Sequence, residues 1–457
     1  MELKGFLKRR NKRLIVLMAV LLLMLIAGCG GGGSSSTGYT GHIISGTVTL
    51  NGAALSGVFV TVQSNGIAAV TTDANGNYSV TNVPNGVYTI TASLTGYSFS
   101  PSTSLSVVIN GADVPGQNFT AAKGGKTNAS LSGAYNMVSF DKTLPSVVSG
   151  TITFTSGNWT GTGMQMTIGS TQMPTVSGKG TYAVSATESS AGLFTLTPTT
   201  ALGNTTATAS QCIMSDDTNT VVCAKVGDMT DQYSLIAVKA GTSVYSTASL
   251  NGTYYMAIFN QSPGSSSQFG TLTCDGYGGF KFAATQGSSS AANQAVSQSG
   301  TYTVTATGTA TFTPTSGTGM TCGMSADSNT LVCASMASAN VQIGVAVKTA
   351  GSGYSNASLT GAYYASYLDS LSPFESGWLI GVPDGKGTMI NVGVQGNSTG
   401  PSQPLTNSVP YSVNANGTFT IGATGSATQC GMSANKNTLV CAEVDKTTEQ
   451  SILILIK

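Results

Sequence analysis

The strongest constraint on the fold is that one sequence unit occurs three times. Each unit opens with a related segment of seven residues, and the three openings lie at 129–135, 248–254 and 357–363. Each unit also carries two cysteines with ten residues between them. These pairs are Cys212/Cys223, Cys322/Cys333 and Cys430/Cys441. They recur at steps of 110 and 108 residues, so each unit is long enough for its own core and too long for a solenoid repeat.

The repeats have the composition of half-buried β-strands. Runs of Thr, Val and Tyr occupy equivalent places at 181–185, 301–305 and 411–413, and such residues favour pleated sheets. We count about seven or eight such runs per unit and no convincing helix. The sequence therefore predicts an all-β protein whose repeats are compact antiparallel barrels or sandwiches. The three predicted domains cover residues 128–241, 248–349 and 357–457.

The first 28 residues have the pattern of a secretory signal peptide. Six basic side chains precede residue 14, and an apolar run of 15 residues follows. A membrane-spanning helix needs about 20 such residues. The run ends in an Ile-Ala-Gly-Cys segment at 26–29, which resembles the bacterial lipobox, in which the cysteine becomes residue one and its thiol is acylated.

The lipobox resemblance implies a lipoprotein anchored to a membrane through Cys29. An ordinary signal peptide with an incidental cysteine is the alternative. Gly30 follows the cysteine in place of the Asp that resembles an inner-membrane retention signal, so we expect an outer-membrane or cell-surface location. Residues 29–42, rich in Gly and Ser, are predicted to form a flexible tether.

Charge argues against several classes of function. Without residues 1–28 the chain holds 12 Lys, no Arg and 16 acidic residues, a net charge of −4. Phosphate and nucleic-acid sites depend on Arg for bidentate contacts, so we expect no nucleic-acid partner. The chain has one histidine, His42, whereas a catalytic triad needs a histidine base and a His-type zinc site needs several. We expect no enzymatic activity, no cofactor and no metal site.

Residues 43–121 have the strand and turn pattern of a small β-sandwich. The segments SGTV at 45–48, TTDANGNY at 71–78 and VPNGVY at 83–88 follow one another. In this order they resemble the carboxypeptidase regulatory-like domain, a transthyretin-like sandwich grouped with carbohydrate-binding-like folds. The resemblance implies an accessory module with no activity of its own. Tyr78 and Tyr88 are expected in its core, and Asp73 is interpreted as a turn residue that bonds the backbone rather than as a calcium ligand.

The paired cysteines are predicted to form three cross-strand disulfides, Cys212–Cys223, Cys322–Cys333 and Cys430–Cys441. A two-residue loop at 217–218 would set Cys212 directly opposite Cys223 in a hairpin, and the same spacing holds in the other two units. Export makes disulfides possible. Metal binding is the alternative, but the spacing does not resemble a Cys-x2-Cys site.

Cys274 has no predicted partner. It aligns with Phe154 on the apolar side of a strand, so we expect a buried, unreactive thiol, with a dimer-forming or catalytic thiol as the alternative. In the pairs Tyr254-Tyr255 and Tyr363-Tyr364 the two rings point to opposite faces, so one ring of each pair is expected in the core.

Three short motifs resemble catalytic or binding motifs but do not indicate such sites. Residues 396–400 match the G-x-S-x-G pattern of serine hydrolases, but no histidine follows them. Residues 381–388 approach a phosphate-binding loop, are one residue short and fit a hairpin turn better. Asp216 and Asp217 form the only adjacent acidic pair outside the signal and lie in a predicted turn.

Trp378 is the candidate binding residue. Alignment of residues 377–379 with 150–152 and 270–272 places it where the other copies have Thr, on the polar side of its strand. An outward tryptophan can stack on a sugar ring or another ligand. A tryptophan that caps one end of a barrel is the alternative.

These observations favour a non-enzymatic, membrane-anchored extracytoplasmic lipoprotein that serves as a binding, adhesion or envelope structural module. Its expected partners are the membrane, through the lipid, and glycans or envelope and surface proteins. The alternative is a carbohydrate-binding protein that uses the sandwich or its exposed aromatic residues. The ligand, the orientation in the membrane and the oligomeric state stay open at this point.

Overall fold

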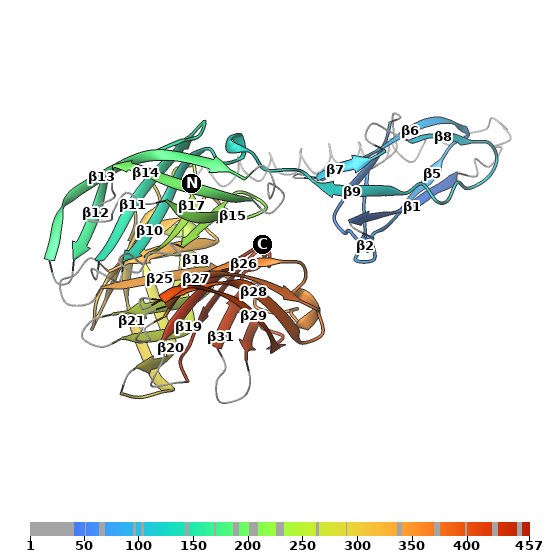
Figure 1. Ribbon diagram of the computed structural model, residues 1–457. Helices are drawn as coiled ribbons and strands as arrows, with labels where there is room; N and C mark the ends of the chain where they lie inside the picture. The colour runs from blue at the N-terminus through green and yellow to red at the C-terminus, as the bar shows by residue number, and fades with distance from the viewer. Residues whose placement is uncertain are drawn as a thin grey trace, which may run out of the picture. The chain divides into compact units, whose positions relative to one another are not determined.

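The computed structural model contains two compact units, residues 1–122 and 123–457, and each is described by itself (Figure 1). It describes residues 41–457 apart from 51, 64–68, 95–96, 102–104, 142–145, 169–170, 186–191, 201–208, 225–232, 262–264, 289, 336–340, 370–374, 398–399, 423–427 and 446–449. In these described parts, no helix has the length and apolar character needed to cross a membrane.

The first unit is a sandwich of two β-sheets, as the sequence predicts. One sheet has the order β2-β1-β9-β7 with β5 also paired to β1, and the other has the order β4-β3-β6-β8. The strands are β1 (His42–Leu50), β2 (Ala53–Ala54), β3 (Phe59–Gln63), β4 (Val70–Thr71), β5 (Asn77–Val83), β6 (Gly86–Ser93), β7 (Tyr97–Ser100), β8 (Leu105–Ile109) and β9 (Phe119–Lys123). Tyr78 and Tyr88 are both buried in the core between the sheets.

The turn at Asp73 is held by hydrogen bonds to the backbone. Its Oδ1 accepts the N–H groups of Asn75 at 2.9 Å and of Asn77 at 2.8 Å. This is the turn role expected from the sequence. His42, the residue at which the predicted tether ends, is the first residue of β1, and its Nδ1 lies 3.8 Å from Oδ1 of Asp113.

The second unit consists of three closed antiparallel β-barrels of eight strands each. The first comprises β10 (Gly133–Asp141), β11 (Ser146–Thr155), β12 (Asn158–Ile168), β13 (Thr171–Val184), β14 (Leu193–Thr200), β15 (Ser210–Met214), β16 (Thr220–Ala224) and β17 (Tyr233–Lys239). The second comprises β18 (Asn251–Asn260), β19 (Ser266–Asp275), β20 (Gly279–Ser288), β21 (Gln294–Val304), β22 (Thr309–Pro314), β23 (Met320–Met324), β24 (Thr330–Ala334) and β25 (Gln342–Lys348). The third comprises β26 (Tyr363–Asp369), β27 (Glu375–Pro383), β28 (Thr388–Asn397), β29 (Gly400–Val413), β30 (Thr418–Ile421), β31 (Thr428–Met432), β32 (Thr438–Ala442) and β33 (Ser451–Ile456).

Strands that are neighbours in sequence are neighbours in each barrel, and the last strand pairs with the first. The prediction of barrels or sandwiches is thus resolved in favour of barrels. A short 3-10 turn precedes each barrel: η1 (Asn128–Ser130), η2 (Thr247–Ser249) and η3 (Asn356–Ser358).

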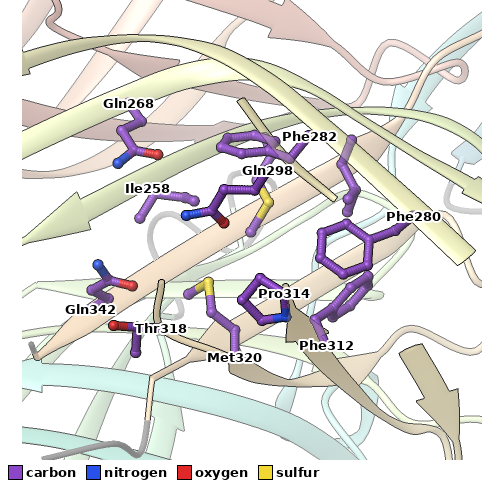
Figure 2. Close-up of a pocket in the computed structure, with 12 residues that line it drawn as sticks. Ile258, Gln268, Phe280, Phe282, Gln298, Phe312, Pro314, Thr318, Met320 and Gln342 are labelled. Atoms are coloured by element: carbon purple, nitrogen blue, oxygen red, sulfur yellow. The ribbon is translucent and has the colours of Figure 1, made fainter. Parts of the chain in front are cut away.

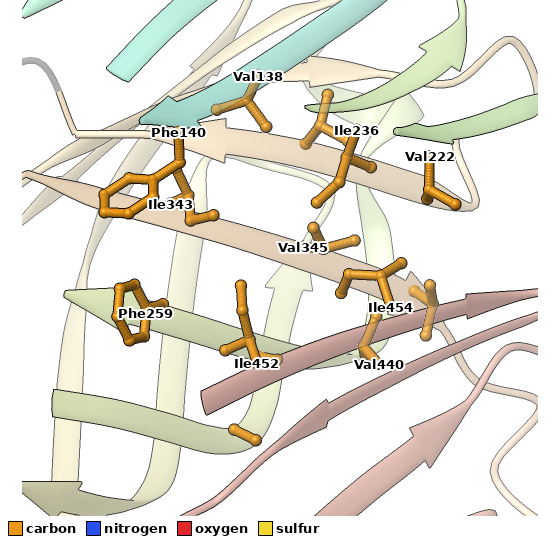
Figure 3. Packing of buried hydrophobic residues seen from close by; sticks show 14 of the residues in the cluster. Val138, Phe140, Val222, Ile236, Phe259, Ile343, Val345, Val440, Ile452 and Ile454 are labelled. Atoms are coloured by element: carbon orange, nitrogen blue, oxygen red, sulfur yellow. The ribbon is translucent and has the colours of Figure 1, made fainter. Parts of the chain in front are cut away.

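The three barrels share a further core that lies outside all of them. Aliphatic and aromatic side chains meet there from the outer faces of several strands, chiefly the first, seventh and last of the barrels, and Figure 3 shows part of this cluster. Phe140 of the first barrel meets Phe259 of the second edge-to-face, with ring centroids 5.5 Å apart. This core explains why Tyr255 is buried although it points out of its own barrel. We expected one buried ring in the pair Tyr254-Tyr255, whereas both rings are buried.

Backbone hydrogen bonds join the barrels in a closed cycle. In each barrel a hairpin turn donates one N–H to the carbonyl at the end of another barrel's last strand. The bonds run from Ala326 to Lys239 at 2.8 Å, from Ala434 to Lys348 at 2.8 Å and from Asp216 to Lys457 at 2.6 Å. We call these the clasp bonds. Each barrel both donates and accepts one, so the three repeats form a pseudo-threefold ring.

Candidate functional site

The six paired cysteines form three disulfides, and each disulfide cross-links the two strands of the hairpin that makes a clasp bond. Cys212 lies directly opposite Cys223 on β15 and β16, and the other two pairs occupy the same register. The disulfides are Cys212–Cys223, Cys322–Cys333 and Cys430–Cys441. All six cysteines are buried, so the bonds lie in the barrel cores.

The turn between these cysteines is longer than the two-residue loop expected. β15 ends at Met214 and β16 begins at Thr220. The N–H of Ser215 donates to the carbonyl of Thr220 at 2.8 Å, and inside the turn the N–H of Thr218 donates to the carbonyl of Ser215 at 2.9 Å. Asp217 shapes the loop, because its Oδ1 accepts the Ser215 hydroxyl at 2.6 Å and the Asn219 N–H at 3.0 Å. Asp216 and Asp217 therefore have structural roles at a turn, which is where the sequence places them.

In each repeat, a residue of the linker before the barrel donates hydrogen bonds to the disulfide-linked hairpin of that barrel. The hydroxyls of Tyr245 and Tyr354 donate to the carbonyls of Ser325 at 3.2 Å and Ser433 at 3.4 Å. In the first copy Lys126 takes this place. Its buried ammonium donates to Met214 O at 2.8 Å and Ser215 O at 2.9 Å and lies 3.4 Å from Asp216 Oδ1.

Cys274 is the free cysteine among the described residues, and it is buried inside the second barrel. It faces Gly252 on β18, just as Phe154 faces Gly133 on β10, so the predicted alignment holds. Burial, together with the neighbouring Asp275 carboxylate, raises the pKa of this thiol to about 12. A thiol with so high a pKa is a poor nucleophile at neutral pH.

Trp378 lies at the interface between the third and first barrels, which we call the seam. With Tyr364 and Ile213 it lines a small, almost wholly apolar cavity of about 20 Å³. A volume of this size has room for about one water molecule, so it cannot receive a sugar ring. Trp378 is half-buried at the seam, and its role as a binding residue stays a prediction.

The register also corrects the alignment used for Trp378. Trp378 pairs with Ser366 on β26, and the residue in this place in the second barrel is Phe269, which pairs with Ala257. Trp378 therefore corresponds to Phe269, two positions before Thr271. Phe269 stacks on Tyr255 in the core between the barrels, with centroids 6.2 Å apart.

The second barrel contains a cavity that no sequence motif predicted. It measures about 60 Å³. Its residues are Met256, Ile258, Gln268, Leu272, Phe280, Phe282, Gln298, Phe312, Pro314, Thr318, Met320 and Gln342. Figure 2 shows aromatic rings and Pro314 on one side and the amides of Gln268 and Gln342, with Thr318, on the other. No charged residue lines it.

This space exists because the second barrel has smaller inward side chains than the first. Phe280 stands where the first barrel has Trp159, since each pairs with the equivalent glycine of the next strand. Gly344, opposite Cys333, stands where the first and third barrels have Leu235 and Leu453, each opposite the equivalent cysteine. A glycine at a position that is otherwise leucine is the sequence signal that could have revealed the cavity.

The two remaining sequence motifs lie at hairpins of the third barrel. Residues 381–388 form the β27–β28 hairpin, where Asp384 Oδ1 accepts the N–H groups of Lys386, Gly387 and Thr388. The G-x-S-x-G match falls at the β28–β29 hairpin, and its residues 398–399 lie outside the described residues, as does Cys29. Across the described part of the chain, no group of three or more His, Cys, Asp or Glu could hold a metal ion.

The sandwich has a broad hollow lined by both polar and apolar groups. Its walls carry Ser45, Thr47, Thr71, Asp73, Asn77 and Asn118. The aromatic residue at this hollow, Tyr78, is buried, and burial raises the pKa of its phenol to about 12. The hollow thus offers hydroxyls and amides but no exposed ring from Tyr78 for stacking.

Comparison with known proteins identifies the first unit. Residues 43–122 match the carboxypeptidase regulatory-like domain. This domain covers the sandwich alone. No curated protein sequence matches the chain.

Two solved structures align over most of the chain, both with low TM-scores. Transferrin binding protein B from Neisseria meningitidis aligns over 81% of this chain and 83% of its own, at 8% identity and a TM-score of 0.22. The protein of that name from Haemophilus parasuis Hp5 aligns over 93% and 96%, at 7% identity and a TM-score of 0.18. TM-scores this low support no argument about function.

Proposed function

We propose that this chain is a non-enzymatic extracytoplasmic binding protein, held at an outer membrane or cell surface by lipid on Cys29. In this proposal the Gly/Ser-rich tether of residues 29–42 separates the membrane from the folded units. The barrel ring supplies a rigid body, and the sandwich is an accessory module.

The observation that carries the proposal is the repeated disulfide hairpin. Each disulfide fixes the hairpin whose turn makes a clasp bond to another barrel. Disulfides persist in oxidising compartments and are rare in the cytosol. A ring whose three joints all depend on oxidised hairpins is suited to a place outside the cytoplasm.

The binding role is supported by the cavity of the second barrel. This cavity lies where the second barrel has Gly344 in place of the leucines of the first and third barrels. An apolar pocket with a few polar groups at one side is the usual form of a small-molecule site.

Carbohydrate binding is the second candidate, favoured by the hydroxyl and amide side chains in the hollow of the sandwich. Binding on a glycan array that survives Trp378→Ala and is lost in Asn118→Ala would support the sandwich as its site. Asn118 also accepts hydrogen bonds from Thr47, so the folding of that variant needs a check by circular dichroism. No glycan signal at all would remove this candidate.

The proposed location is tested in a two-membrane bacterium that expresses the full chain. Labelled palmitate should be incorporated into the wild type and into Cys274→Ala, the matched cysteine control, and not into Cys29→Ala. Protease added to intact cells separates a surface protein from one that faces the periplasm. Wild-type chain that carries no lipid label, or that stays in the cytosol with reduced cysteines, would refute the proposal.

A further inference from the structure

We propose that the interior of the second barrel binds a small uncharged molecule with an apolar end and a hydrogen-bonding head. This inference gives a ligand class to the binding role proposed above and rests on it. The second barrel has Phe280 and Gly344 at this cavity, where the first barrel has the larger Trp159 and Leu235. The third barrel has Leu453 at the place of Gly344.

The aromatic side of the cavity selects an apolar group. Phe280, Phe282 and Phe312 form this side, and Phe280 meets Phe312 edge-to-face with centroids 5.2 Å apart. Met256 and Met320 complete it. Methionine side chains adapt to the shape of a neighbour, so the cavity can widen slightly around an entering group.

The other side selects a polar head. Gln268, Gln298 and Gln342 come from three different strands, and each amide can both donate and accept hydrogen bonds. Gln268 is oriented by a neighbour, since its Nε2 donates to Oε1 of Gln286 at 2.8 Å. A primary amide or a hydroxyl matches such a rim, because it also carries both functions.

The absence of charge from the lining excludes an ionised ligand. No Asp, Glu, Lys, Arg or His is among the residues around the cavity, and an ion moved out of water needs a partner charge or metal. The volume of 60 Å³ corresponds to space for roughly four to six water-sized groups. An alkyl chain of five carbons fits this space, with a polar head placed at the glutamine side.

The test uses the chain from residue 30 onward, which contains every residue that the structure describes. Methionine methyl groups are labelled with ¹³C, and hexanamide is added as the probe. We expect saturable shifts of Met256 and Met320, while Met137, Met164 and Met166 in the first barrel stay unchanged. Hexanoate and hexylammonium, of the same length but charged, should bind at least tenfold more weakly.

Gly344→Leu is the decisive variant, because it copies the first and third barrels. A side chain there meets the flexible ends of Met256 and Met320, at 2.8 Å and 3.2 Å from the added Cβ. We expect at least tenfold weaker hexanamide binding. If this variant does not fold, Gly344→Ala is the smaller filling change, and Gln298→Leu should remove the preference for hexanamide over an alkane of equal length.

No saturable shift with hexanamide, equal binding of the charged analogues, or undiminished binding in folded Gly344→Leu would each overturn the inference. These outcomes are independent of the lipid label and of location in the cell. A failure here therefore leaves the proposed location intact, and a failure there leaves the pocket intact.

Discussion

Removal of one disulfide should weaken the ring by an amount set by the length of the closed loop. The sequence separation is 11 residues in all three bonds. For a loop this short, the loss of chain entropy in the unfolded state corresponds to about 2.8 kcal/mol. We therefore expect Cys430→Ala/Cys441→Ala to lower the free energy of unfolding of residues 123–457 by about that amount, plus a smaller packing loss.

Equilibrium urea unfolding of the oxidised protein measures this difference, and Cys274→Ala is the matched control. Cys274 is a buried cysteine of the same unit with no cross-link, so its replacement reports the loss of sulfur packing alone. Hydrogen exchange at the Ala434 amide, which donates the clasp bond to Lys348, should also quicken in the double variant. The reasoning is wrong if the double variant and the control lose the same stability, or if exchange at Ala434 is unchanged.

Three further predictions follow from contacts. Gly431→Ile copies Ile213 of the first barrel, but it should lower the free energy of unfolding by about 1–3 kcal/mol through overpacking, because a Cβ at Gly431 lies 2.3 Å from Cβ of Tyr255. Urea unfolding measures this loss, and an unchanged midpoint would contradict the prediction. Lys126→Met should lower the free energy of unfolding by about 1.5–3 kcal/mol, because the hydrogen bonds of the charged ammonium are lost. Lys126→Tyr should recover part of this stability by copying Tyr245. Burial raises the pKa of the Tyr78 phenol to about 12. Its contribution to stability is therefore present below pH 10 and falls as the pH rises from about 10 to 12. Spectrophotometric titration of the wild type and of Tyr78→Phe checks this shift.

The cysteine register was predictable because it depends on local spacing alone. Ten residues between Cys212 and Cys223 allow one symmetric hairpin, and that hairpin forms although its turn is longer than expected. Closure into a barrel was not predictable, because it depends on pairing between β10 and β17, about one hundred residues apart.

The position of Trp378 shows a second limit of sequence reasoning. Matching Gly377 to Gly150 put Trp378 beside the threonines, whereas the β26 register aligns it with Phe269. The phase along the strand is unaffected by a shift of two, so Trp378 does point out of its barrel. The sequence pattern distinguishes inside from outside one barrel, but it does not show that a neighbouring barrel covers the outer face, as it does for Tyr255.

The ring also explains why the repeats diverge at the seam. The first and second barrels approach closely at Gly323, where an added Cβ would lie 2.3 Å from Cβ of Asn136, and Gly431 has the same closeness to Tyr255 at the next interface. The first barrel has Ile213 at this position, and there a cavity of about 20 Å³ is left beside Tyr364. Once two interfaces have formed, the third closes within a single chain at high effective concentration. Less exact packing is then sufficient at the seam, provided that Asp216 and Lys126 hold the hairpin that makes the last clasp bond.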